Sequence, residues 1–311
     1  MTDSSAVLVD GPWQHRFVSA NGARFHVVEA GTDPTAPLVV LLHGFPEHWW
    51  AWRHQLPALA AAGYRAVAMD LRGAGASDKP PQGYDMPTLA RDVAGVIRSL
   101  GAQDAVVVGH GLGGTIAWSM PSLQPRVTQA IAVFSSAHPS RLHTSAMTWP
   151  LATRATGRHL AFFQLPLLPE RRLTRGDLVP RLLAEWSGPG WPDRATATTY
   201  REAMQIPFAA HSAMEVFRWL ARSTPRVDGQ RYLAAVRAPV RVPVLQVHGA
   251  QDHCIPASAV GTGRHGSPFR FETVPGAGHF VPEEAPGRST EVLLDWLGSL
   301  DGAPGPTIPS V

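Results

Sequence analysis

Two side chains of this sequence, Asp252 and His279, combine the chemical types and the positions that acid–base catalysis needs. Asp252 lies in VHGAQDHCIP and His279 in VPGAGHFVPEE, so each follows a short apolar run of the kind that forms a buried strand. A carboxylate beside an imidazole fixes its tautomer and stabilises its charged form. We therefore predict that Asp252 orients His279 and that His279 acts as a general base.

A third position, Gly111, has the surroundings of a catalytic nucleophile but no side chain. The apolar segment DAVVVGH leads into the turn G-H-G-L-G-G and then into a helical pattern. A strand-to-helix turn of the form glycine–x–nucleophile–x–glycine exposes its central side chain at the tip. Because the central residue here is a glycine, we predict that the nucleophile is absent.

The same six residues, Gly109–Gly114, also match the dinucleotide-binding pattern G-x-G-x-x-G. That kind of site requires an acidic residue about 20 positions further on, at the end of the next strand. The next predicted strand ends in VFSSAH, which contains no acid, and the motif does not follow the first strand of the fold. The sequence therefore favours a vacant nucleophile position, and we expect neither a cofactor nor a metal.

Alternating strand and helix patterns must position these residues. Residues 14–18 and 24–29 flank Asn21-Gly22, which is a strong signal for a β-hairpin. The buried-strand patterns PLVVLLHG, YRAVAMD and DAVVVGH then alternate with helical patterns. This alternation predicts an α/β fold, with a mostly parallel sheet flanked by helices on both faces.

The alternation stops between residues 140 and 237, where aromatic residues recur within helical patterns. Strand patterns resume at VPVLQVHG and FRFETVPG, so we predict a helical cap of residues 140–237 inserted into a core of residues 1–139 and 238–300. Residues 301–311 hold little apolar surface and are expected to form a flexible tail. A cap rich in aromatic residues predicts a pocket for a small apolar molecule.

Composition restricts the class of partner. The net charge of +3 comes without a basic run, which argues against a nucleic-acid partner. A single cysteine, Cys254, excludes an internal disulfide and fits a reducing compartment. The start of the sequence lacks a secretory signal, and no apolar run reaches the roughly 18 residues of a membrane span. We expect a soluble, cytoplasmic protein, monomeric or homodimeric, without a membrane partner.

The segment His43–Glu47, with the sequence HGFPE, carries a further motif. It follows the apolar run PLVVLL and precedes the tryptophan-rich HWWAWR. Together with the loop Asp70–Asp78, the turn at Gly111 and the segments that hold the acid and the histidine, it makes the sequence resemble the α/β-hydrolase superfamily. Within that superfamily, the resemblance is to the branch of epoxide hydrolases and haloalkane dehalogenases.

The resemblance implies roles for backbone groups near Gly111. In this family two N–H groups form an oxyanion hole, and the matching residues here are Phe45 and Leu112. Such donors stabilise charge that develops in the transition state. The chain order of nucleophile position, acid and histidine is also that of the family.

The resemblance further implies a substrate pocket beneath the cap. Epoxide hydrolases use two cap tyrosines to hold and protonate the epoxide oxygen, but Phe217 and His159 stand at the corresponding positions. Tyr200 is the one cap tyrosine in a plausible helical context, and its position is equally consistent with packing. The residues expected to line the pocket are His43, Pro46, His110, Trp149, His159, Tyr200 and Phe217.

Two functions fit these observations. The first is hydrolysis of a small apolar epoxide or ester by water that His279 deprotonates in the space of the missing nucleophile. The second is non-catalytic binding of an apolar ligand or partner in the cap pocket. Glycine at the turn relaxes a strained backbone, which suits a protein freed from catalysis. The retained Asp252 and His279 favour the first function, and the missing cap tyrosines favour the second.

Overall fold

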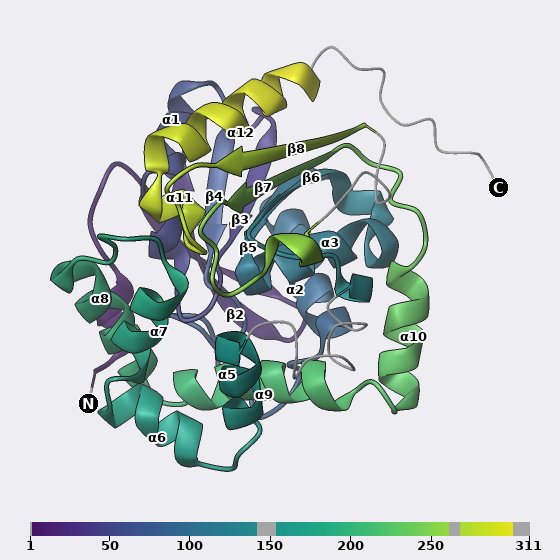
Figure 1. Cartoon of the computed structure of the whole chain (residues 1–311). Helices are drawn as coiled ribbons and strands as arrows, with labels where there is room; N and C mark the ends of the chain where they lie inside the picture. Colours follow the sequence, from purple (N-terminus) through teal and green to yellow (C-terminus); the bar gives the residue numbers. More distant parts are fainter. Residues whose placement is uncertain (1, 142–153, 261–267, 301–311) are drawn as a thin grey trace.

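A single eight-stranded sheet forms the centre of the computed structural model, which describes residues 2–141, 154–260 and 268–300 (Figure 1). The strand order is β1-β2-β4-β3-β5-β6-β7-β8; β2 pairs antiparallel with β1 and β4, and the remaining neighbours are parallel. The predicted fold class is therefore confirmed. The strands are β1 Gln14–Ala20, β2 Ala23–Ala30, β3 Leu38–Leu42, β4 Arg65–Met69, β5 Ala105–His110, β6 Thr128–Phe134, β7 Val244–Gly249 and β8 Phe269–Val274.

The first two strands form the predicted hairpin. Asn21 and Gly22 connect them with φ angles of 46° and 74°. Two successive positive φ angles are what a tight two-residue hairpin turn requires, and asparagine and glycine adopt them most readily. The sequence signal was correct because it depends only on these local backbone preferences.

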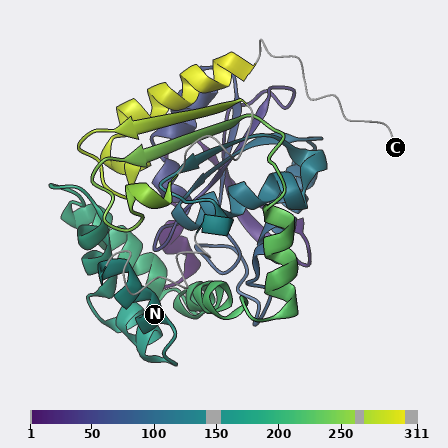
Figure 2. The same ribbon diagram turned by 45° about the vertical axis from the view of Figure 1, so that its right-hand side comes forward.

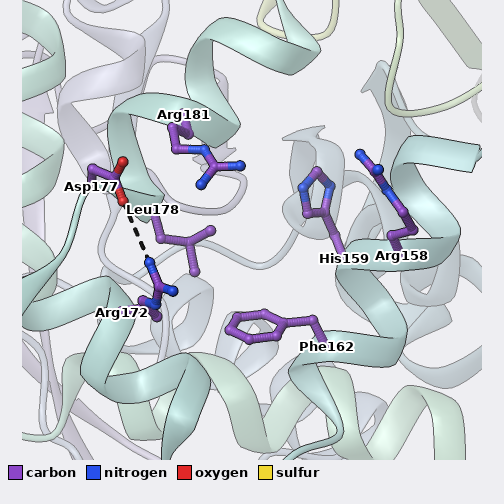
Figure 3. Close-up of a pocket in the computed structure, with 7 residues that line it drawn as sticks. All are labelled: Arg158, His159, Phe162, Arg172, Asp177, Leu178 and Arg181. Atoms are coloured by element: carbon purple, nitrogen blue, oxygen red, sulfur yellow. Dashed lines mark ion pairs between the residues drawn. The ribbon is translucent and has the colours of Figure 1, made fainter.

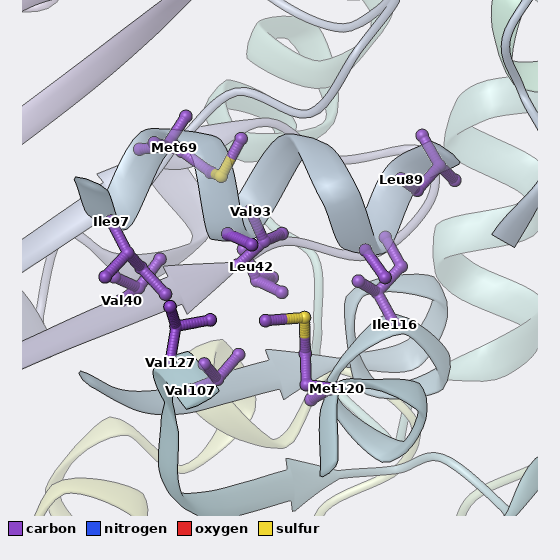
Figure 4. Packing of buried hydrophobic residues seen from close by; sticks show 14 of the residues in the cluster. Val40, Leu42, Met69, Leu89, Val93, Ile97, Val107, Ile116, Met120 and Val127 are labelled. Atoms are coloured by element: carbon purple, nitrogen blue, oxygen red, sulfur yellow. The ribbon is translucent and has the colours of Figure 1, made fainter. Parts of the chain in front are cut away.

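Helices cover both faces of the sheet, which explains why its central strands are apolar at every position. On β3, Val40 and Leu42 face the helices α2 (Met86–Ser99) and α3 (Gly111–Leu123), where they join the cluster shown in Figure 4. Val39 and Leu41 face α1 (Gln55–Ala61) and α12 (Pro286–Leu300) on the other side. A strand buried on both faces has no position left for a polar residue.

The chain between β6 and β7 is helical in its described part. Its helices are α5 Arg154–Phe163, α6 Leu168–Arg175, α7 Leu178–Trp186, α8 Arg194–Gln205, α9 Ala209–Arg222 and α10 Val227–Val236. Figures 1 and 2 show α5 to α9 gathered at one end of the sheet. Their shared apolar cluster includes Phe163, Leu182 and Met214, together with Phe45 from the loop after β3.

The last helix of this insertion, α10, packs differently. Its Tyr232, Leu233 and Val236 belong to the apolar cluster of the sheet, and the Tyr232 hydroxyl lies 2.9 Å from the Ser119 Oγ of α3. α10 thus packs against the sheet and not with α5 to α9.

None of the helices in the described part of the chain combines the length and the apolar character of a membrane span.

Candidate active site

The carboxyl ends of the parallel strands bring four loops to one edge of the sheet. His43–Glu47 follows β3, Gly111 follows β5, Asp252 follows β7 and His279 follows β8. Parallel strands place the segments that follow them at the same edge, so residues far apart in the sequence meet there.

Gly111 is the first residue of α3 and has a φ of +52°. A Cβ atom added to it would lie 3.3 Å from His279 Nε2 and 3.7 Å from Gly44 Cα. A side chain at position 111 would therefore point directly at the imidazole. At this position of the strand-to-helix turn the chain carries only a hydrogen atom.

The neighbouring glycines are explained by close packing of the turn. A Cβ on Gly109 would lie 2.2 Å from the Gly113 carbonyl oxygen, and one on Gly113 would lie 2.3 Å from the Leu42 carbonyl oxygen. Only glycine permits such close approach of one backbone to another. The turn's own packing thus accounts for Gly109, the first glycine of the dinucleotide-like pattern, and for the neighbouring Gly113, without a bound nucleotide.

Asp252 and His279 are hydrogen-bonded, with Nδ1 of the histidine 3.0 Å from Oδ2 of the carboxylate. The other carboxylate oxygen accepts the N–H groups of Cys254 and Ile255, each at 2.8 Å. Burial alone would raise the pKa of Asp252, but its interactions with His279, together with those with His248 and the Ile255 N–H, lower the pKa. Because a carboxylate accepts, Nδ1 carries the proton, which leaves Nε2 facing Gly111 able to act as a base.

The position of His279 is fixed from several sides. Its backbone N–H donates to the Trp186 carbonyl of α7 at 2.9 Å, and its ring lies 5.7 Å from the Trp186 ring. Glu284, at the end of α11 (Val281–Glu284), accepts the N–H groups of Gly278 at 2.7 Å and Phe280 at 2.8 Å. Glu284 was not predicted from the sequence to have a role. The segment GHFVPEE did contain a signal for such a role, because acidic residues near the start of a helix can accept backbone N–H groups.

The two N–H groups expected to form an oxyanion hole belong to residues that follow Gly111 and Gly44 in the sequence, and a Cβ at position 111 would contact Gly44. Leu112 is the second residue of α3, where helix geometry provides no intrahelical acceptor for its N–H. Phe45 lies in the loop after β3, just before a cis peptide bond to the buried Pro46. Within the described part of the chain, neither N–H has an acceptor.

Glu47 and His110 form a buried pair that contacts the backbone of Gly44 and His279. Glu47 Oε2 accepts the Gly44 N–H at 2.8 Å and lies 2.7 Å from His110 Nδ1. His110 Nε2 lies 2.8 Å from the His279 carbonyl oxygen. Burial disfavours the charged imidazole, but Glu47 raises the pKa of His110, and both ring nitrogens then donate. His110 was expected in the pocket lining; the structure instead uses it to join the loop after β3 to the backbone of His279.

His43 also differs from the expectation. The structure buries its ring, whose Nδ1 lies 2.7 Å from the Gly44 carbonyl oxygen. Its Nε2 accepts the Leu71 N–H at 3.1 Å. Burial lowers the pKa of His43, so the neutral ring donates through one nitrogen and accepts through the other. His43 thus connects two loops, and it has no ring nitrogen left for a substrate.

Aromatic side chains of α5, α7 and α9 contact Phe45 and His279. Phe217 of α9 lies 5.0 Å, ring centre to ring centre, from Phe45, and Phe163 of α5 lies 5.6 Å from Phe45. His159 accepts the Trp186 indole N–H at 3.3 Å through Nδ1, and its Nε2 lies 3.1 Å from Glu185. Phe217 thus contacts Phe45, whose N–H is expected to belong to the oxyanion hole. The ring nitrogens of His159 instead contact Trp186 and Glu185 of α7. Trp149 lies outside the described residues.

Tyr200 is a packing residue, and its expected place in the pocket lining is corrected. Its side chain is fully buried, with ring contacts to His48 at 5.6 Å and Trp50 at 5.9 Å. Its hydroxyl donates to Glu283, which also forms an ion pair with Arg53. Burial raises the pKa of Glu283 to about 7 against the opposing effect of Arg53.

With this geometry established, comparison with known proteins assigns the class. The family described as alpha/beta hydrolase fold matches residues 37–286, and the chain belongs to that family. It is 31% identical over 287 residues to the AB hydrolase superfamily protein YfhM of Bacillus subtilis, covering 91% of this chain and 97% of that protein.

The relatives point to the branch of epoxide hydrolases. Epoxide hydrolase A of Mycobacterium tuberculosis is 32% identical, covering 92% of this chain and 98% of the relative. Among solved structures, an epoxide hydrolase from an endophytic Streptomyces has a TM-score of 0.78 at 28% identity, covering 94% of this chain and 98% of that one. Cfl2 from Burkholderia cenocepacia has a TM-score of 0.80 at 27% identity, covering 92% and 96%. The chain is an epoxide hydrolase-like α/β-hydrolase.

Proposed function

We propose that this protein hydrolyses small apolar esters or epoxides without forming a covalent intermediate. The observation that most directly supports this function is the space beside Gly111. An atom at the position of the missing Cβ would lie 3.3 Å from His279 Nε2. A water oxygen there is close to hydrogen-bond distance of a base. His279 would remove a proton from this water, while Asp252 stabilises the resulting imidazolium.

The predicted oxyanion hole favours esters over epoxides. Attack of water on an ester carbonyl puts negative charge on the carbonyl oxygen, which the N–H groups of Phe45 and Leu112 would stabilise. Opening an epoxide instead needs a proton donor for the leaving oxygen. Phe217 cannot supply one, and the Tyr200 hydroxyl is bound to Glu283. The imidazolium of His279 would give its proton to the leaving oxygen of an ester, which then departs as a neutral alcohol.

A panel of p-nitrophenyl esters of short acids and of small aryl epoxides tests this function. We expect ester hydrolysis that falls by about 10²–10⁴-fold in His279→Gln, the usual contribution of a general base. His211→Gln, in the exposed part of α9, is the matched control and should keep full activity. Unchanged ester hydrolysis in His279→Gln would refute the proposed role of this histidine.

Non-catalytic binding of an apolar ligand is the second candidate function. The engagement of Tyr200 by Glu283 favours it, because the described cap then offers no tyrosine hydroxyl to a substrate at the expected position. Saturable binding of the apolar esters with no turnover, in the wild-type protein, would select this function over hydrolysis.

A further inference from the structure

A cavity of about 260 Å³ opens between helices α5, α6 and α7 of the cap (Figure 3). It is lined by Arg158, His159, Phe162, Arg172, Asp177, Leu178 and Arg181. Figure 3 shows Leu178 and Arg181 on one side of the cavity, facing His159 and Phe162 on the other. Three guanidinium groups and two apolar side chains thus surround one space.

The positive charge of this cavity is only partly neutralised. Arg172 lies 4.0 Å from Asp177, and both side chains are exposed. Arg181 is exposed and lies 3.6 Å from the half-buried Glu185, which is also paired with His159 at 3.1 Å. Exposed pairs of this kind are weak and exchange easily for another anion. No carboxylate in the described part of the chain forms an ion pair with Arg158.

Two of these guanidinium groups, those of Arg158 and Arg181, line the same cavity as His159. Burial lowers the pKa of His159, and the positive charges of Arg158 and Arg181 lower it further, against the opposing effect of Glu185. Both guanidinium groups therefore contribute positive charge near His159. An anion in this cavity would be attracted by both.

The cap as a whole is positively charged. Residues 140–237 contain 14 arginines and 7 carboxylates, a net charge of +7, although the entire chain has a net charge of only +3. The rest of the chain must therefore be negative, with a net charge of −4. A positive field concentrated at one end of a protein attracts anions toward that end.

We propose that this cavity binds small apolar carboxylates. The carboxylate would pair with the guanidinium groups of Arg158 and Arg181, which both line the cavity and whose planar shape matches carboxylate geometry. The apolar part would lie against Phe162 and Leu178. The volume is near the lower limit of small-molecule pockets, roughly 300–1,000 Å³, so a short acid fits and a long chain does not.

The site is distinct from the catalytic residues and lies one side chain away from them. His159, at its edge, accepts the indole N–H of Trp186, whose ring contacts His279. Binding at this cavity does not depend on hydrolysis, so it is measurable even if the protein has no catalytic activity.

Calorimetric titration with phenylacetate tests the proposal, with phenylacetamide as the neutral isostere. We expect saturable binding of phenylacetate and none of the amide. Arg158→Gln combined with Arg181→Gln should weaken phenylacetate binding by about tenfold or more, because hydrogen bonds to the charged group are lost. The control combines Arg194→Gln with Arg201→Gln on α8, which removes the same net charge outside the cavity lining and should bind normally.

Three results would overturn the proposal. The first is equal binding of acid and amide, and the second is equal loss in the cavity variant and the α8 control. The third is binding that survives in the cavity variant but disappears in His279→Gln, which would place the carboxylate at the catalytic histidine. A parallel titration with phenyl phosphate distinguishes a carboxylate site from a general anion site. Binding of phenyl phosphate more tightly than phenylacetate would contradict carboxylate as the preferred group.

Discussion

Replacing Gly111 with aspartate should restore a nucleophile at the strand-to-helix turn. Gly111 has a φ of +52°, a conformation that costs about 1–3 kcal/mol for residues with a side chain. Aspartate is among the residues that tolerate it best. Loss of glycine's freedom in the unfolded chain offsets about 0.4–1 kcal/mol. The new Cβ would lie 3.3 Å from His279 Nε2, a tight contact that adds to the cost. We expect a net destabilisation of about 1–2 kcal/mol.

The restored carboxylate should be alkylated by reactive epoxides, since it would lie beside His279 and between the expected N–H donors. Intact-protein mass spectrometry after incubation with styrene oxide, followed by peptide mapping, would locate the adduct at residue 111. Gly111→Asn is the matched control: it has a similar shape and backbone cost but no carboxylate, and should stay unmodified. A folded Gly111→Asp protein without an adduct would refute the assignment of position 111 as the nucleophile site.

Three further predictions follow from the site and its supports. Asp252→Asn should reduce any His279-dependent turnover by about 10²–10⁴-fold, measured as kcat/KM, because the amide no longer stabilises the imidazolium; turnover equal to wild type would contradict the pairing. Tyr200→Phe should leave kcat/KM within about threefold but lower the unfolding free energy by about 1–3 kcal/mol, since Glu283 loses a buried hydrogen bond; a large loss of activity with normal stability would assign Tyr200 to catalysis. Glu283 has a pKa of about 7 in the folded protein, above its ordinary value of 4.5, so its contribution to stability is full below about pH 4.5 and is lost as the pH rises through 7. Urea unfolding of Glu283→Gln and wild type should therefore show a stability difference that moves in favour of the variant between pH 5 and 8, and a difference independent of pH would contradict the raised pKa.

The fold was predictable because its signals are local or periodic. Asn21-Gly22 specifies the hairpin by backbone preference alone, and β3 shows its burial by an unbroken apolar run. The hydrogen bond between Asp252 and His279 was predicted from their positions after successive strands, and the structure contains it. The catalytic roles of these residues stay predictions.

The supporting contacts could not be predicted, because they join distant residues whose partners the sequence does not reveal. Tyr200 finds Glu283, which lies 83 positions further along the chain. His110 and His43 are of a residue type suited to catalysis, but their ring nitrogens form hydrogen bonds with buried backbone groups and with Glu47. Helical periodicity also did not reveal that α10 packs against α3. An apolar helix face is expected both for a helix of the cap and for a helix that covers the sheet, so the pattern does not distinguish the two.

In the mechanism proposed for this protein, His279 activates water directly and no covalent intermediate forms at residue 111. Rapid mixing of p-nitrophenyl butyrate with the protein, once with protein in excess and once with substrate in excess, tests this mechanism when quenched samples are analysed by mass spectrometry. We expect a single exponential release of p-nitrophenol with protein in excess, no initial burst with substrate in excess, and no acylated protein at any time. A burst accompanied by a butyryl adduct would refute the mechanism, because some side chain of this protein would then act as the nucleophile.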